Sequence, residues 1–297
     1  MYKGKAISDL TIKQYTVTLN KLKSFEAYKK TRLKFENLDL AFHTDFIFYC
    51  KTIETLGNTS IGGHIKNIKM WCRNIEIEGY KVSPQHKHRS FATISSPTYD
   101  IYLTEDEVNQ IFNFDFSYNN RLGNARDWFI IGLRTGLRIS DFLNRLENIN
   151  IANNRISIIT KKTNAPALIP MHDQFRQIYT ANNNNLPHKI SNQKFNEYIK
   201  EICLIVGFKT IVFGGKMNPA TKRKQIGHFE KWELVTSHIC RRTFATSLYG
   251  KMPIKDIMAV TTHTSIASFE KYIKTSSEES AANIEAYWAE QKNVIKK

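Results

Sequence analysis

The sequence predicts a mainly α-helical protein with a small antiparallel β-sheet, divided into two domains. Apolar residues recur at three- and four-residue steps through most of residues 1–80 and again from His238 onward, which is typical of amphipathic helices. Short β-like runs separated by polar turns lie between these helical regions. The 297 residues, 41% of them hydrophobic, are enough for two domains that each have a core.

Residues 1–80 are predicted to form a bundle of three helices. Each helix is expected to begin near a polar capping residue: Ser8 or Asp9, Thr44, and Thr59. The expected apolar faces are Ile12, Tyr15, Leu19, Leu22 and Phe25; then Phe46, Tyr49, Cys50 and Ile53; then Ile61, Ile65, Ile68 and Trp71 or Cys72. The polar sides of the bundle carry Lys66, Lys69 and Arg73.

Residues 81–99 are predicted to be a linker, because prolines and serines interrupt the helical pattern there. His86 and His88 lie in this segment without further metal ligands nearby in sequence. We therefore expect them to be solvated linker residues and not a metal site.

The second domain, residues 100–297, opens with a strong local signal. Thr104 and Glu107 have the spacing of a capping box, and Leu103 and Val108 that of a hydrophobic staple, so a helix should begin at about Glu105. A later helix should end at Gly136 with a left-handed cap. Residues 147–171 contain β-like runs separated by Asn153-Asn154 and by residues 162–165, which predicts a three-stranded antiparallel sheet.

The charge of the chain favours a polyanionic partner. The formal net charge is +16 at pH 7. Residues 1–99 hold 16 Lys and Arg against 8 Asp and Glu. Residues 100–297 hold 27 Lys and Arg against 19 Asp and Glu, so both parts are basic. This distribution is expected if each part contacts phosphate, and it leaves DNA and RNA both open.

Several classes of site are disfavoured. The four cysteines show no CxxC pairing, and we expect small buried side chains without a disulfide or a metal site. A nucleotide-binding loop is absent, since Met217 follows Gly214-Gly215-Lys216, and HExxH motifs and a convincing carboxylate set are missing as well. No cofactor or metal is therefore expected. No apolar run is long enough for a membrane span or a signal peptide, so we expect a cytoplasmic protein.

What remains is a series of basic residues that ends in a tyrosine. His238 and Arg241 are three residues apart, so a helix would place both on one face. Arg138 follows the turn at Gly136, and Ser140 could cap the next helix. Lys162 lies in a predicted turn between strands. His263 and Tyr272 are nine residues apart, so we expect a cap or bend near Ser265. Taken singly, each residue is better explained as an ordinary surface, cap or packing residue.

The ordered combination is more specific. TGLRIS, then KT in a β-turn, then HxxRRTFAT, then THTSIASFEKY resembles the tyrosine recombinase family of phage and conjugative-transposon integrases over about residues 100–280. The resemblance implies a helical, SAM-like core-binding domain and a mixed α/β catalytic domain that form a C-shaped clamp around DNA. It implies that the two catalytic arginines, the hairpin lysine, the two histidine positions and the nucleophile are Arg138, Arg241, Lys162, His238, His263 and Tyr272. Lys161 remains an alternative to Lys162.

The implied function is a site-specific DNA recombinase that cuts and rejoins strands through a 3′-phosphotyrosine and integrates or excises a mobile element. The alternatives are a type IB topoisomerase or dimer resolvase, and an inactive DNA-binding regulator. The implied partners are double-stranded DNA, three further copies of the chain on synapsed DNA, and accessory DNA-bending proteins, in the bacterial cytoplasm or nucleoid. Expected DNA contacts are Lys66, Lys69, Arg73, Lys222, Arg223 and Lys224.

Three features bear on this resemblance. Many members have glycine where this chain has Thr262, so the local backbone is expected to be more constrained. Many have histidine where this chain has Arg242. An N-terminal arm-binding domain is not recognisable, so the chain is either a simple recombinase or a fragment. The tail carries Ile284, Tyr287 and Trp288 at helical spacing, which predicts a helix that packs on its own domain or on a neighbouring protomer.

Overall fold

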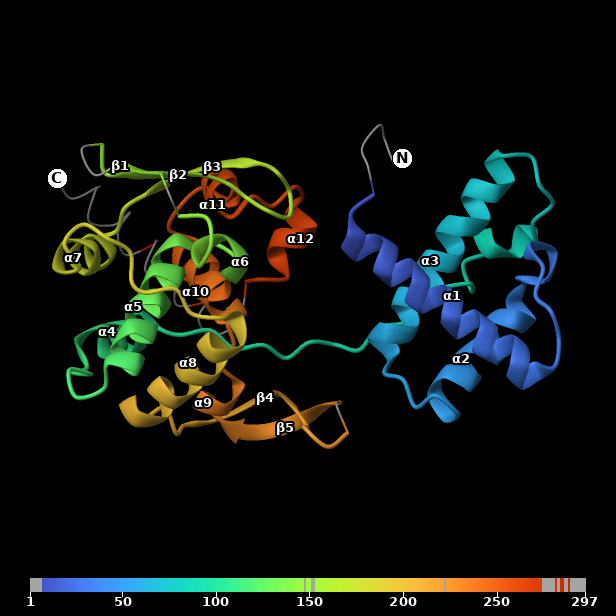
Figure 1. Cartoon of the computed structure of the whole chain (residues 1–297), viewed down its shortest axis with the longest axis horizontal. Coiled ribbons are helices and arrows are strands. Elements are labelled where there is room, and N and C mark those ends of the chain that lie inside the picture. The colour runs from blue at the N-terminus through green and yellow to red at the C-terminus, as the bar shows by residue number, and fades with distance from the viewer. Residues whose placement is uncertain are drawn as a thin grey trace. The chain divides into compact units, whose positions relative to one another are not determined.

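The computed structural model describes residues 7–146, 148–150, 153–221 and 223–273, together with positions 281, 284, 285 and 288 of the tail. The chain divides into two compact units, Met1–Thr98 and Tyr99–Lys297. Both are built mainly of helices, and the second also contains two small antiparallel sheets (Figure 1). The predicted fold class, mainly helical with a small antiparallel sheet, is confirmed.

The first unit contains α1 (Asp9–Lys29), α2 (Leu40–Thr52) and α3 (Asn58–Ile77), with short 3-10 turns η1 (Phe35–Asn37) and η2 (Pro84–Lys87). Ser8 caps α1 as expected, since its hydroxyl accepts from the Thr11 N–H. The other two caps differ from the prediction. Asp39 caps α2, and Gly57 precedes α3 without a side-chain cap, so both helices start earlier than Thr44 and Thr59 suggested.

The core of this unit joins the three helices through buried aromatic and aliphatic side chains. The predicted faces of α2 and α3 are buried apart from Ile53, which is exposed, and Trp71, which is partly buried. The predicted face of α1 is partly wrong. Ile12 and Leu19 are exposed, whereas Phe25 is buried as predicted, and Thr18, which the prediction did not include, also points inward. Thr18 can lie inside because its hydroxyl is 2.9 Å from Nδ1 of the buried His64.

The segment predicted as a linker does not behave as one along its whole length. His86 and Phe91 are fully buried, and Phe91 belongs to the core of the first unit. Nδ1 of His86 lies 2.7 Å from the Ser83 carbonyl oxygen, so this histidine is a structural residue and not a solvated one. His88 is exposed. Residues 92–104 contain neither helix nor strand.

The second unit is organised around α5 (Asn120–Thr135), a largely buried helix whose C-terminus leads into the candidate site. The other helices are α4 (Glu105–Asn113), α6 (Ile139–Phe142), α7 (Asp173–Ala181), α8 (Asn192–Val206), α9 (Lys231–Leu234), α10 (His238–Leu248), α11 (Ile254–Thr261) and α12 (Ile266–Glu270). A Cβ atom on Gly132 of α5 would lie 3.0 Å from the Cys240 sulfur of α10 and 3.0 Å from the Phe142 ring. The missing side chain therefore lets α5 and α10 pack closely.

The first sheet is the predicted one, with strand order β1-β2-β3. Its strands are β1 (Asn148–Asn150), β2 (Arg155–Ile159) and β3 (Pro166–Pro170), all antiparallel. Ile156 pairs with Ile169, and both are buried on the face that meets the core. Asn154 takes a positive φ of 50° in the first turn, as asparagine tolerates.

A second hairpin, β4 (Ile211–Met217) and β5 (Lys224–Glu230), was not predicted. Its pattern is obscured by Gly214, Gly215 and Gly227, which interrupt the alternation of apolar and polar residues. Gly214 faces Leu234 of α9, which covers one side of the hairpin. The strands also expose several large apolar side chains, namely Ile211, Phe213, Met217 and Ile226.

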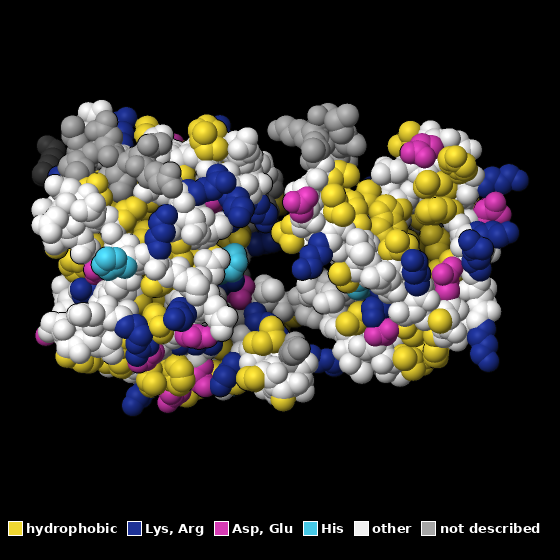
Figure 2. Space-filling view, in the orientation of Figure 1, with side chains coloured by type: hydrophobic (Ala, Val, Ile, Leu, Met, Phe, Trp, Pro, Cys, Tyr) yellow, Lys and Arg dark blue, Asp and Glu magenta, His cyan; other side chains and the backbone are white. Residues whose placement is uncertain are grey.

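The local signals at the start of the second unit are confirmed. Thr104 and Glu107 form both hydrogen bonds of the capping box of α4, and Leu103 and Val108 are fully buried. All four cysteines are buried and unpaired. Within the described part of the chain, no helix combines the length and the apolar character that a membrane span requires. Lys and Arg side chains are present on the visible surface of each unit (Figure 2).

Candidate active site

Arg241, on the second turn of α10, is the centre of the candidate site. Its side chain is only 1% exposed. Nη1 donates to the Gly136 carbonyl oxygen at 3.2 Å, and Nη2 donates to the Thr261 carbonyl oxygen and to Nε2 of His263, the latter at 3.2 Å. One guanidinium therefore joins the end of α5, the end of α11 and the following histidine.

Arg138 approaches the same place from the loop after α5. Gly136 ends that helix with a φ of 62°, as predicted, and the Phe244 ring packs against it. Arg138 is itself the N-cap residue of α6, so Ser140 is not the cap that the sequence suggested. Burial lowers the pKa of Arg241 to about 10, and the positive charge of Arg138 adds to this effect.

His263 and Tyr272 are brought together by the predicted break in the helix. The α11 helix ends at Thr261, Thr262 follows in the left-handed region with a φ of 52°, and Ser265 caps α12. The bend near Ser265 is therefore confirmed. The rings of His263 and Tyr272 are 4.8 Å apart between centroids. The Thr246 hydroxyl donates to the Tyr272 carbonyl oxygen at 3.3 Å, which ties the tyrosine to α10.

The pKa of His263 is affected by the positive charges of three candidate catalytic residues. Burial lowers the pKa of this histidine to about 3, and the charges of Arg241, Arg138 and Lys162 add to the shift. The imidazole is therefore neutral at physiological pH. Lys162 itself is exposed in the turn between β2 and β3. The positive charge of Lys162 contributes to the lowered pKa of His263, whereas Lys161 does not contribute to it.

Asp141 is a residue that the sequence reasoning missed. It lies in α6, three residues after Arg138, and is fully buried. Oδ1 accepts the Lys161 backbone N–H at 2.8 Å, which anchors the β2–β3 turn, and Oδ2 has no hydrogen-bond partner among the described residues. Its negative charge raises the pKa of Arg241, opposing the effect of burial. The available signal was an acidic residue one helical turn after a candidate arginine.

His238 stands at the first position of α10 with an exposed side chain. Partial desolvation of the ring, followed by the charges of Arg242 and Arg241, lowers its pKa. Asp100 acts in the opposite direction, and it forms an ion pair with Arg242 at 2.8 Å. His238 is therefore a neutral histidine at the rim of a positively charged site.

The residues proposed for DNA contact differ in their surroundings. Lys66 and Arg73 are exposed on α3. Lys69 is partly buried, and its ammonium donates to the Phe91 carbonyl oxygen at 2.5 Å, so its charge is engaged within the first unit. Lys224 lies 3.4 Å from Asp100, and Arg223 is exposed. Lys222 lies outside the described residues.

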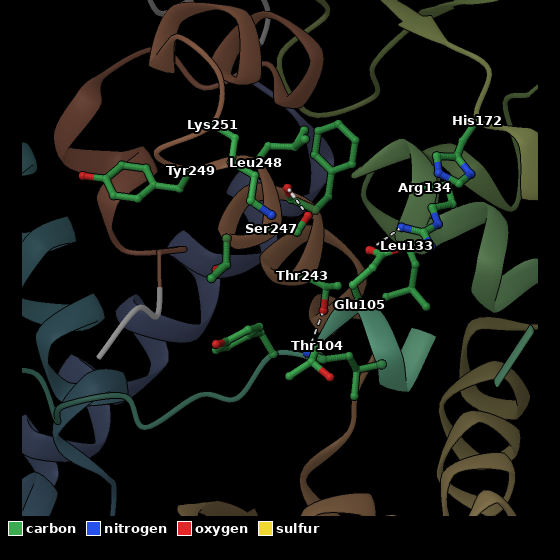
Figure 3. A pocket seen from close by; sticks show the side chains of 14 residues that line it. Thr104, Glu105, Leu133, Arg134, His172, Thr243, Ser247, Leu248, Tyr249 and Lys251 are labelled. Atoms are coloured by element: carbon green, nitrogen blue, oxygen red, sulfur yellow. Dashed lines mark hydrogen bonds and ion pairs between the residues drawn. The ribbon is translucent and has the colours of Figure 1, made fainter. Parts of the chain in front are cut away.

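A cavity of about 510 Å³ opens beside α10, lined by Tyr102, Thr104, Arg134, Thr243, Leu248 and other side chains (Figure 3). Arg134 is already paired there, because Nη1 donates to Glu105 at 2.8 Å and Nε to Gln174 at 2.7 Å. None of the six candidate catalytic residues lines this cavity. Among the described residues, no cluster of His, Cys, Asp and Glu side chains could hold a metal ion.

The buried Arg241 and the partly buried Arg138 lie near Tyr272, as expected of an enzyme that transfers DNA strands through a tyrosine. The model of the phage integrase family matches residues 102–279, and that of the phage integrase SAM-like domain matches residues 2–89. The chain therefore belongs to the phage integrase family. It is a tyrosine-type site-specific DNA recombinase, as the resemblance implied.

Solved structures of similar fold include three DNA complexes. The integrase of transposon Tn1549 with a circular-intermediate DNA has a TM-score of 0.66 at 14% identity, covering 96% of each chain. A lambda integrase tetramer on a Holliday junction has a TM-score of 0.60 at 13% identity, covering 91% of this chain and 73% of that one. XerH recombinase bound to difH has a TM-score of 0.60 at 16% identity, covering 92% of this chain and 79% of that one. These likenesses show the fold. A comparison with curated protein sequences finds no match.

Proposed function

We propose that Tyr272 is the nucleophile of this recombinase, and that Arg138 and Arg241 bind the phosphate that it attacks. The observation that carries the proposal is a pair of buried donors without partners. Nη1 of Arg138 and Nε of Arg241 make no hydrogen bond among the described residues, although both atoms are shielded from solvent. Buried donors are normally satisfied, and a phosphate oxygen would satisfy both.

The chemistry follows from charge. As the Tyr272 oxygen forms a bond to phosphorus, negative charge accumulates on the nonbridging oxygens, and two fixed guanidiniums stabilise it without a metal. The phenol must lose its proton, for which His238 is the proposed acceptor, since it is neutral and exposed at the rim of the site. The bond from phosphorus to the 5′ oxygen breaks at the same time.

The leaving 5′ oxygen gains a proton from Lys162 in this proposal. The lysine lies on a turn that Asp141 anchors through the neighbouring Lys161 N–H, and its charge is felt at His263. Both observations favour Lys162 over Lys161. The product is a 3′-phosphotyrosine and a free 5′ hydroxyl. A 5′ hydroxyl from a second DNA then reverses the reaction on the new partner, so no ATP is needed.

The decisive experiment uses a nicked duplex that carries the attachment site of the chain's own genetic element. Cleavage beside the nick releases a short fragment and traps the covalent adduct, which survives in SDS. The wild-type chain should form this adduct and the Tyr272→Phe variant should not, while both should bind the duplex with similar affinity. Tyr249→Phe is the matched control, because Tyr249 lies in the same part of the unit but outside the proposed machinery. An SDS-resistant adduct with Tyr272→Phe would show that the nucleophile is another residue.

We propose double-stranded DNA as the partner of both units. Residues 1–80 together with the packed part of 81–99 would form the core-binding domain, the rest of 81–99 the linker, and residues 100–297 the catalytic domain of a C-shaped clamp. The basic charge of both parts supports this proposal. Solved structures of similar fold that contain DNA, the Tn1549 integrase and XerH recombinase complexes, support it as well. Affinity should then fall steeply between low and moderate salt, and an isotherm that does not change would exclude a clamp held by phosphate contacts.

We further propose that four copies act together on synapsed DNA, aided by DNA-bending proteins, to integrate or excise a mobile element in the bacterial cytoplasm or nucleoid. The lambda integrase tetramer on a Holliday junction, which has a similar fold, supports four copies. In the tail, Ile284 is 50% exposed and Trp288 is 61% exposed, which favours a helix that packs on a neighbouring protomer. Tyr287 lies outside the described residues. Removal of the residues after 280 should abolish synapsis and preserve binding to single sites.

A further inference from the structure

Asp100 joins the beginning of the second unit to helix α10. Its carboxylate forms an ion pair with the Arg242 guanidinium at 2.8 Å, and the Lys224 ammonium of β5 lies 3.4 Å from it. The Asp100–Arg242 pair is mostly buried, since 16% of one side chain and 15% of the other are exposed. Three residues later, the Leu103 N–H donates to the Thr243 hydroxyl of α10 at 3.0 Å. One charged contact and one neutral contact therefore fix this segment to α10.

Arg242 lies beside His238, the proposed acceptor of the proton from Tyr272. The two residues are four apart on α10, so the helix places their side chains on the same face, one turn apart. His238, Arg242 and Asp100 also line the same cavity, which has a volume of about 270 Å³. A positive charge one turn away disfavours a protonated imidazole and weakens it as a base. The ion pair with Asp100 opposes this effect.

Asp100 is the negative charge that counteracts the cations around His238. Two carboxylates line the cavity, Asp100 and Glu233. Glu233 is paired with Lys216, so its charge is already engaged. Desolvation and the neighbouring arginines lower the pKa of His238, and Asp100 raises it. The positive groups that act on the histidine or line its cavity are Arg241 and Arg242 of α10, Arg138 after α5, Lys200 of α8, Lys216 of β4 and Lys224 of β5.

We infer that Asp100 is a positioning residue of the active site, whose carboxylate offsets the charge of Arg242 and so keeps His238 able to accept a proton from the nucleophile. The inference rests on the proposed function for its effect on cleavage. The action of Asp100 on the histidine itself stands on the ion pair, the helical spacing and the shared cavity.

A small set of substitutions separates the charge of Asp100 from its anchoring contact. Asp100→Asn removes the negative charge and keeps the shape, whereas Asp100→Glu keeps the charge. Arg242→Gln removes the positive charge. The double variant Asp100→Asn/Arg242→Gln removes both charges, so neither member of a buried pair is left uncompensated. Thr243→Val is the matched control, because it removes the neutral contact of the same segment with α10 and changes no charge.

The first measurement is the titration of the His238 ring, followed by NMR of histidine-labelled protein without DNA from about pH 4 to pH 8. The chain has nine histidines, so the signal lost in His238→Gln assigns the ring. We expect the pKa of His238 to be lowest in Asp100→Asn and highest in Arg242→Gln, with the wild-type chain and the double variant between them. Asp100→Glu and Thr243→Val should titrate like the wild-type chain.

A pKa of His238 in Asp100→Asn that equals or exceeds the wild-type value would overturn the inference. Should Asp100→Asn fail to fold, Arg242→Gln and the double variant measure the effect of the same carboxylate. The pKa of His238 should then be lower in the double variant than in Arg242→Gln, and equal values would overturn the inference as well.

The second measurement is the pH dependence of adduct formation on the nicked attachment-site duplex, at DNA concentrations below saturation, where the rate reports groups of the free enzyme. The rate should fall at acid pH as His238 gains a proton. This fall should move to lower pH in Asp100→Asn and to higher pH in Arg242→Gln. At higher pH, Asp100→Asn should be about threefold slower, because a weaker base accepts the proton less readily, and Asp100→Glu should recover the rate.

The two measurements distinguish the possible failures. A rate in Asp100→Asn that is reduced by one factor at every pH would reject the inference and leave Asp100 as an anchoring contact only. If the ring titrates as expected but the rate does not follow it, His238 is not the proton acceptor and that step of the proposed function is wrong. A wild-type chain that forms no adduct would contradict the proposed function, and the titration would still decide whether Asp100 acts on His238.

Discussion

The guanidinium carbon of Arg241 lies 5.5 Å from the centre of the Tyr272 ring. The two residues are far apart in sequence, and the fold joins them through α10, because Arg241 belongs to this helix and Thr246 of the same helix holds the Tyr272 carbonyl. A shift of α10 would therefore move the proposed phosphate-binding group and the proposed nucleophile together.

Arg241→Lys should slow adduct formation by about 10²- to 10³-fold, the loss expected when one fixed donor to a developing oxyanion is removed. A lysine retains the charge but cannot reach Gly136, Thr261 and a phosphate at once, as the planar guanidinium can. Single-turnover cleavage measures the rate, and DNA affinity should change only a few-fold. Arg176→Lys on the exposed face of α7 is the control. An active Arg241→Lys enzyme would show that charge alone suffices.

Gly136→Ala should destabilise the protein more than Gly207→Ala. Both glycines end helices with positive φ, so alanine at either position costs about 1–2 kcal/mol of backbone strain. A Cβ atom at Gly136 would also lie 2.5 Å from Phe244, whereas nothing lies within 4 Å at Gly207. We expect a further loss of about 1–3 kcal/mol at Gly136 from overpacking. Urea unfolding gives the difference, and equal losses would mean that Phe244 moves aside freely.

Lys162→Ala should block cleavage of an ordinary duplex, and Lys161→Ala should have a much smaller effect. The two neighbours share a turn and an exposed environment, so each is a control for the other. If Lys162 protonates the leaving oxygen, a substrate with sulfur at the 5′ bridging position should restore the rate of Lys162→Ala, because a thiolate leaves without a proton. If the sulfur substrate restored the rate of Lys161→Ala and not that of Lys162→Ala, Lys161 would be the residue that protonates the leaving oxygen.

The free energy of unfolding should fall as the pH drops from about 6.5 towards 3. The pKa of His263 is about 3 in the folded state, below its ordinary value, so in this range the unfolded chain binds the proton and the folded chain does not. One such group contributes a slope of at most about 1.4 kcal/mol per pH unit. His263→Asn should show a shallower slope than the wild-type chain in urea unfolding between pH 4 and 7. Identical slopes would mean that His263 titrates normally.

The sequence predicted those parts of the fold that local interactions determine. The capping box at Thr104, the helix end at Gly136 and the bend at Ser265 each depend on residues within one turn of one another. The inward face of α1 was harder to predict from the sequence. The apolar pattern favoured Ile12 and Leu19, but Thr18 is buried because its hydroxyl bonds to His64 of α3. Tertiary contacts decide such a choice, and periodicity alone does not contain them.

The candidate site was predicted as a set of residue types, without its supporting contacts. Asp141 and Thr261 are ordinary polar residues in the sequence, and their importance depends on distant partners, namely the Lys161 amide and the Arg241 guanidinium. The β4–β5 hairpin was missed for a different reason, since its glycines hide the strand pattern. The strained backbone at Thr262 was anticipated from the resemblance, and its φ of 52° agrees with that expectation.

The close packing at Gly132 links the hydrophobic interior to the reaction. The α5 helix leads into the loop of Arg138 and α10 carries Arg241, so the thickness of the contact between these helices determines how far apart the two guanidiniums stand. The packing of apolar side chains beneath the site therefore determines the width of the gap that we propose as the phosphate-binding position. Screens for loss of recombination should consequently recover changes at Gly132, Phe142 and Cys240, none of which needs to meet the nucleic acid.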